Sequence, residues 1–167
     1  MTLKLLSFLF LALMLFGVQP ADARTYGSSQ VGLVVQSGDG STSTRCITFN
    51  EPEISGYDVL NRSGLDLVVS GGALGLTICD IEGESGCPAA ECFCQCPPPG
   101  DPCEFWHYWH LTENEWVTSP LGASSSVVHH GDVEGWSWGA GDAPALIAFE
   151  EICAPAYTIY LPMVLRF

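Results

Sequence analysis

Hydrophobic and polar residues alternate along much of the chain with a period of two, which is typical of β-strands. The first two such segments are 31–35 (Val-Gly-Leu-Val-Val) and 45–49 (Arg-Cys-Ile-Thr-Phe). A Gly-Asp-Gly turn signal at 38–40 separates them, so we expect the two strands to form a hairpin. Further strands are predicted at 65–70, 74–81, 105–111, 115–118, 126–128 and 133–138.

One segment, 53–64, departs from the strand pattern and predicts a short helix. Ser55 is a preferred capping residue, and Gly64 is typical of the position after a helix end. The apolar face of this helix would consist of Tyr57, Val59 and Leu60. We therefore predict an α+β fold, in which a small, twisted, mostly antiparallel β-sheet packs against one short helix.

The strand predicted at 105–111 is unusually aromatic. All five tryptophans and all four histidines of the chain lie between Phe105 and Trp138. On a strand, Trp106, Tyr108 and His110 share one face. The opposite face carries Phe105, His107, Trp109 and Leu111. Because both faces are aromatic, either the sheet is covered on both sides or one face is exposed and binds another molecule.

These aromatic residues are the candidates for ligand binding, and we expect the face with Trp106 and Tyr108 to be the exposed one. The candidate ligand-binding residues are Trp106, Tyr108, Trp109, Trp116 and Trp136. The same rings can instead form a core or contact another protein, and the pattern favours neither interpretation.

The eight cysteines predict a disulfide framework, because an even number in an exported chain is typical of one. They are Cys46, Cys79, Cys87, Cys92, Cys94, Cys96, Cys103 and Cys153. Five of them lie in the loop predicted at 82–103, which makes this segment a disulfide-stapled, cysteine-rich insert. A zinc site formed by four of these thiolates is the alternative, but the spacing lacks the paired Cys-x-x-Cys of zinc ribbons. The pairing itself does not follow from the sequence.

Residues 1–23 have the pattern of a signal peptide. Lys4 precedes an apolar run at 5–18, and Ala21 and Ala23 form a small-residue cleavage site. The run is shorter than the ~20 residues of a membrane span. We therefore expect a secreted or envelope-held protein that is not integral to the membrane after cleavage, with 24–30 as a flexible lead-in.

The net charge of −14 limits the partners that this surface attracts. It repels phosphate backbones and so argues against nucleic acid, whereas cationic ligands or divalent ions are electrostatically favoured. The sequence contains no Gly-x-Ser-x-Gly, His-Glu-x-x-His or phosphate-loop motif, so we do not expect an enzyme. His107 and His110 point to opposite faces of a strand, so no metal or resident cofactor is expected.

Two segments carry a resemblance to a known family. The sequences 106–109 (Trp-His-Tyr-Trp) and 131–136 (Gly-Asp-Val-Glu-Gly-Trp) are its most specific parts, and 56–60 (Gly-Tyr-Asp-Val-Leu) is weaker. They resemble the transcobalamin/intrinsic-factor C-terminal-like domain, a domain of unknown function that is widespread in exported bacterial proteins. This resemblance implies a β-grasp-like fold and makes cobalamin or a related corrinoid the candidate ligand.

The resulting hypothesis divides the chain into four parts: a signal peptide at 1–23, the lead-in at 24–30, the transcobalamin C-terminal-like domain at 31–140 with the insert at 82–103, and a C-terminal extension at 141–167. It predicts an exported, non-catalytic domain that binds a corrinoid or another small ligand through an aromatic β-hairpin. The alternative is a structural or adhesive cell-surface module, in which the aromatic residues form the core or contact another envelope protein.

Overall fold

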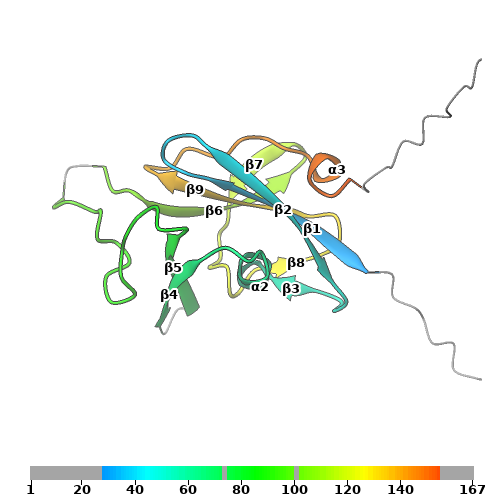
Figure 1. Cartoon of the computed structure of the whole chain (residues 1–167), viewed down its shortest axis with the longest axis horizontal. Helices are drawn as coiled ribbons and strands as arrows, with labels where there is room; N and C mark the ends of the chain where they lie inside the picture. Colours follow the sequence, from blue (N-terminus) through cyan, green and yellow to red (C-terminus); the bar gives the residue numbers. More distant parts are fainter. Residues whose placement is uncertain (1–27, 73–74, 100–101, 155–167) are drawn as a thin grey trace, which may run out of the picture.

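The computed structural model describes residues 28–72, 75–99 and 102–154, which form a layered α+β fold. The predicted signal peptide at 1–23 and residues 155–167 of the extension lie outside this range. A central sheet has a helix and small hairpins on one side and a second, shorter helix on the other (Figure 1). Among the described residues, no helix combines the length and the hydropathy needed to cross a membrane.

The central sheet has five strands in the order β2-β1-β9-β6-β7. Their bounds are Ser29–Gln36 for β1, Thr42–Phe49 for β2, Phe105–Thr112 for β6, Glu115–Thr118 for β7 and Val133–Gly139 for β9. The prediction of a mostly antiparallel sheet is confirmed, because β1–β2, β6–β7 and β6–β9 are antiparallel pairs. Strands β1 and β9 are parallel neighbours, a pairing that the strand pattern alone does not predict.

The predicted helix is present as α2, Gly56–Asn61. It begins with a capping box, in which Ser55 Oγ accepts from the Asp58 N–H at 3.1 Å and Asp58 Oδ2 accepts from the Ser55 N–H at 3.0 Å. Each bond satisfies a backbone donor that the helix start leaves unpaired. Val59 and Leu60 are fully buried against the sheet, so the short helix is held by packing as well as by its cap.

The remaining strands complete the layer on the α2 side of the sheet. They are β3 (Ile54–Ser55), which pairs with β8 (Val127–Val128), and the hairpin of β4 (Leu67–Gly72) and β5 (Gly75–Ile81). The core lies between this layer and the sheet, and includes Leu33, Phe49 and Ile81. Burial of this apolar surface is the main stabilising contribution to the fold.

The opposite face of the sheet is covered by the C-terminal extension, including a four-residue helix, α3 (Phe149–Ile152), that the sequence pattern does not predict. Ile152 lies directly over Gly32 of β1, where an added Cβ would be 2.9 Å from Ile152 Cδ1. A disulfide between Cys46 of β2 and Cys153 ties the end of α3 to the sheet. Residues 141–154 therefore pack as part of the fold.

The predicted disulfide framework is confirmed, since all eight cysteines are paired. The bonds are Cys46–Cys153, Cys79–Cys92, Cys87–Cys94 and Cys96–Cys103. Three of them lie in or next to the insert at 82–103, whose first turn is also organised by the buried carboxylate of Asp80. Asp80 Oδ1 accepts hydrogen bonds from the Ser85 N–H and the Ser85 hydroxyl, both at 2.6 Å.

Candidate functional site

The aromatic strand β6 has the two faces that its sequence predicts. Tyr108 is paired with Trp136 of β9, and their rings stack at 4.8 Å, whereas Trp109 on the other face donates its indole N–H to Ser137 Oγ at 2.9 Å. The expectation that the Trp106 and Tyr108 face is the exposed one is wrong. Both side chains belong to the core, at 6% and 8% exposed, because α2 and the β4–β5 hairpin cover this face.

The other candidate residues are also largely enclosed. Trp136 is 3% exposed in the same core, and Trp109, on the opposite face of the sheet, is 8% exposed. Trp116 is half-buried, and its ring lies over Gly135, where an added Cβ would be 2.7 Å from Trp116 Cζ3. The five aromatic candidates therefore do not form one open surface.

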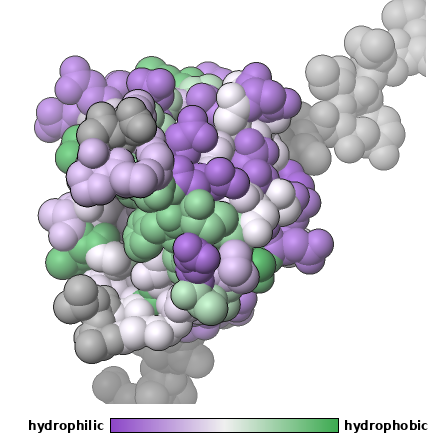
Figure 2. Space-filling model, turned by 90° about the vertical axis from the view of Figure 1, so that its left-hand side faces the viewer, coloured by the Kyte–Doolittle hydropathy of each residue, from purple (hydrophilic) through white to green (hydrophobic). Residues whose placement is uncertain are grey.

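Three of them nevertheless meet at the floor of an apolar groove with a cavity volume of about 190 Å³. Trp106, Tyr108 and Trp136 line it together with residues from β5, the cysteine-rich insert and the loop 119–126. On its rim, Phe93 is 52% exposed and Leu121 is 55% exposed. Strand β5 and the cysteine-rich insert lie towards the left-hand side of Figure 1, and the view from that side shows a hydrophobic patch at the centre of the surface (Figure 2).

The disulfides of the insert hold Phe93 at this groove. Its two neighbours in the chain are Cys92 and Cys94, which bond to Cys79 of β5 and to Cys87 respectively. The ring of Phe93 meets that of Phe105 edge to face, with centroids 5.7 Å apart. The sequence reasoning missed Phe93 and Leu121. The signal that points to Phe93 is its position between two cysteines that each form a disulfide. The backbone of such a residue is fixed on both sides, so its side chain has little freedom to leave the groove.

Two indole donors at the groove have no hydrogen-bond partner among the described residues. They are Nε1 of Trp106 and Nε1 of Trp136, and both are buried. A buried donor without an acceptor costs about 1–3 kcal/mol. Nε1 of Trp116, which does not line the groove, is in the same condition, so the unpaired indole donors do not distinguish the groove from the rest of the protein.

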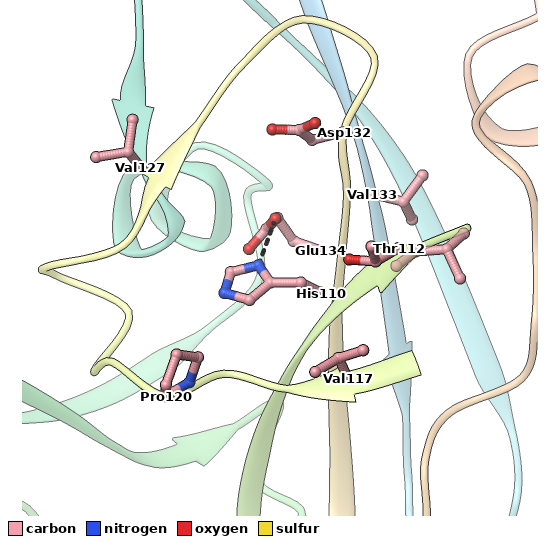
Figure 3. Close-up of a pocket in the computed structure, with 9 residues that line it drawn as sticks. His110, Thr112, Val117, Pro120, Val127, Asp132, Val133 and Glu134 are labelled. Carbon is pink, nitrogen blue, oxygen red and sulfur yellow. Dashed lines mark hydrogen bonds and ion pairs between the residues drawn. The ribbon is translucent and has the colours of Figure 1, made fainter. Parts of the chain in front are cut away.

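The second feature is a buried carboxyl group next to the Tyr108 hydroxyl, which connects several elements through hydrogen bonds. Glu134 of β9 is 1% exposed. It accepts a short hydrogen bond from the Tyr108 hydroxyl through Oε2 and lies 3.0 Å from His110 Nδ1 through Oε1. Figure 3 shows His110 and Glu134 facing each other, beside a cavity of about 360 Å³ that Asp132 and Pro120 also line.

The environment of this cluster shifts two pKa values. The hydrogen bond that His110 donates to Glu134 raises the pKa of His110 above its ordinary value of 6.5, against an opposing effect of burial. Burial, with the adjacent charge of Glu134, raises the pKa of Tyr108 well above its usual range. The environment therefore favours the protonated form of His110 and keeps the Tyr108 hydroxyl a neutral donor.

The cluster extends to Ser119, whose Oγ lies 2.8 Å from His110 Nε2. Serine, histidine and glutamate in this sequence of contacts resemble a catalytic triad. However, Ser119 Oγ also donates to the Leu121 carbonyl at 2.8 Å and accepts from the Leu121 N–H at 3.3 Å. Ser119 therefore anchors the start of the loop 119–126, and the sequence could not reveal this cluster because its members come from separate elements.

No metal site accompanies either feature in the part of the chain that the structure describes, where no three histidine, cysteine, aspartate or glutamate side chains gather as ligands. Comparison with models of known protein families gives no match, and comparison with curated proteins likewise gives none. The arguments for function therefore rest on the groove and the cluster.

Proposed function

We propose that this chain is an exported, non-catalytic binding domain whose ligand occupies the apolar groove at 93, 105–106 and 121–123. The observation that carries the proposal is the composition of the groove, in which three of the predicted aromatic residues form the floor and two exposed apolar side chains form the rim. Concave, mostly apolar sites with a few polar groups are typical of small-molecule binding. The four disulfides are consistent with an extracytoplasmic location.

The volume of the groove and the net charge of the protein limit the class of ligand. A cavity of about 190 Å³ is smaller than the roughly 300–1,000 Å³ of sites that enclose a drug-sized molecule. The groove therefore suits an edge or one face of a larger, flat ligand that is neutral or cationic, given the net charge of −14. A corrinoid meets this description, and the resemblance to the transcobalamin-like domain makes cobalamin the first ligand to test.

We expect cobalamin to bind with a dissociation constant below about 100 μM, and the variant Leu121→Asp to weaken binding at least ~10-fold. The substitution places a carboxylate at the rim, where the ligand would have to desolvate it. Equilibrium dialysis measures the affinity without interference from the ligand's own absorbance.

The matched control is Leu146→Asp, because Leu146 is similarly exposed, at 60%, and is not part of the groove. It should bind as the wild type does. Undetectable binding at ~100 μM by the folded wild-type protein excludes a useful corrinoid affinity. Equal loss in both variants would place the site elsewhere.

The non-catalytic part of the proposal predicts that a fluorophosphonate ester does not modify Ser119. A serine nucleophile needs backbone donors for the developing oxyanion, but the Leu121 N–H donates to Ser119 Oγ itself. Intact mass after incubation at pH 8, where His110 has the greatest tendency to be neutral, measures the reaction. A serine protease in the same solution is the positive control, and a phosphonylated Ser119 would show that the cluster is an active site.

A structural or adhesive cell-surface module is the second candidate, and the burial of the aromatic residues favours it. Trp106, Tyr108, Trp109 and Trp136 are each at most 8% exposed, as expected of core residues. In this case the exposed rim of the groove contacts another envelope protein. Attachment of protein-coated particles to envelope preparations, compared between Leu121→Asp and Leu146→Asp, distinguishes this role from small-molecule binding.

A further inference from the structure

The loop 119–126 forms one wall of the proposed groove through residues 121–123, and both of its ends are fastened to Glu134. At the first end, Ser119 Oγ contacts His110, which pairs with Glu134. At the other end, Ser126 Oγ lies 2.8 Å from the Tyr108 hydroxyl, which donates to the same carboxylate. The groove wall is thus joined to the buried carboxyl group of Glu134 at both ends. One link passes through the imidazole of His110, and the other passes through the hydroxyl of Tyr108.

The hydrogens of the first link are all accounted for when His110 is protonated. Nδ1–H donates to Glu134, Nε2–H donates to Ser119 Oγ, and the Ser119 hydroxyl remains free to donate to the Leu121 carbonyl. Each donor then has one acceptor, and the turn from Ser119 to Leu121 is closed. This arrangement satisfies every polar atom of the link.

When His110 is neutral, the hydrogen-bonded link from Glu134 through His110 to Ser119 has one hydrogen fewer to donate. With the proton on Nδ1, Nε2 becomes an acceptor, and the Ser119 hydroxyl must turn from the Leu121 carbonyl toward the ring. With the proton on Nε2, a lone pair on Nδ1 faces the Glu134 carboxylate. The first tautomer breaks the bond from the Ser119 hydroxyl to the Leu121 carbonyl, and the second breaks the bond between His110 and Glu134. Either one interrupts the chain of contacts from Glu134 to the first end of the wall, whereas the Tyr108–Ser126 link at the other end is unchanged.

The charged and titratable groups around His110 favour the protonated form. Glu134 of β9 and Asp132 of the preceding turn are the anions that act on it, and Tyr108 of β6 is neutral. Residues of β7 and β8 at this cavity, Val117 and Val127, are apolar. His129 is 61% exposed and lies 3.8 Å from Asp132, so it is partly screened from the cluster by water.

We propose that protonation of His110 closes the wall of the ligand groove and that its deprotonation releases the first end of this wall, so that the groove is better formed in mildly acidic than in alkaline solution. This inference rests on the proposed function, because it describes the regulation of the same groove. Because the pKa of His110 is raised on folding, the stabilisation is complete below the unfolded value of 6.5 and is lost as the pH rises through the folded value.

Amide hydrogen exchange of Leu121 tests the inference without any ligand. We expect the protection factor of the Leu121 N–H, after correction for the intrinsic exchange rate, to fall roughly tenfold as the pH is raised from 5.5 to 8.5. The Ser126 end of the wall should change much less. The fall should follow the titration of His110 measured from its ring carbon signals.

Three variants separate the inference from a general loss of structure. In His110→Gln the pH dependence should disappear, and in His129→Gln, which replaces an exposed histidine near the same turn, it should remain. In Ser119→Ala the ring of His110 still titrates but the Leu121 amide should no longer respond. Protection that is constant from pH 5.5 to 8.5 in the wild type would overturn the inference even if cobalamin binds. Failure of cobalamin to bind would contradict the proposed function and leave the pH response of the wall intact.

Discussion

Replacing Glu134 by glutamine is expected to lower the free energy of unfolding by about 3 kcal/mol. Glu134 is 1% exposed and is the shared acceptor of Tyr108 and His110, so it is held by one buried and one partly buried hydrogen bond. A glutamine side chain has the same shape but provides one acceptor and one donor group. It can accept from one of the two partners, and the other is left facing an amide N–H.

Urea denaturation at pH 6.5 measures this loss, with the exposed Glu115→Gln on β7 as the matched control. The control should lie within about 0.5 kcal/mol of the wild type. The variant should also return the pKa of His110 toward its ordinary value, because the hydrogen bond that His110 donates to Glu134 is the largest cause of the shift. A Glu134→Gln protein as stable as the control would mean that the cluster contributes no net stability.

The elements that the sequence predicts correctly are those that depend on residues close together in the chain. The alternation at 105–111 gives β6 and the division of its faces, and Ser55 gives the start of α2. The pairing of β1 with β9 depends instead on contacts between segments at opposite ends of the domain. Nothing in the alternation of either strand specifies a distant neighbour.

For the same reason, the sequence does not predict which face of β6 is exposed. Whether Tyr108 is open or covered depends on the hairpin β4–β5 and on α2, which are distant in the sequence from β6. A period of two shows which side chains share a face but not what lies over that face. The groove lies at the edge of the elements that cover the Tyr108 face, where the disulfide-bonded insert ends and β6 begins.

The cluster of Glu134, His110 and Ser119 illustrates a further limit. The prediction that no catalytic arrangement can be assembled from sequence spacing followed from the absence of local motifs. The structure brings these three residues together because β6 and β9 are antiparallel neighbours, with His110 opposite Glu134, and the chain returns to His110 after β7. The contacts around Ser119, rather than its neighbours in sequence, decide between nucleophile and loop anchor.

The largest effect of all is expected from removing the Cys46–Cys153 disulfide by a double substitution to alanine. This bond joins residues separated by 107 positions, whereas Cys96 and Cys103 are separated by 7. In the chain-entropy account, a closed loop of about 100 residues stabilises the folded state by roughly 4.7 kcal/mol, and one of about seven residues by roughly 2.5 kcal/mol. Removing the first bond also releases the end of α3 from β2, so we expect Ile152 to pack less firmly over Gly32.

Thermal and urea denaturation of the two double-alanine variants, each under non-reducing conditions, compares the contributions directly. We expect the variant that lacks Cys46–Cys153 to lose about 2 kcal/mol more than the variant that lacks Cys96–Cys103. It should also show faster proteolysis between residues 141 and 154, because the disulfide is what fixes the end of this segment to the sheet. Equal losses in the two variants would indicate that packing of α3, and not the covalent closure of the domain, holds the second face of the sheet.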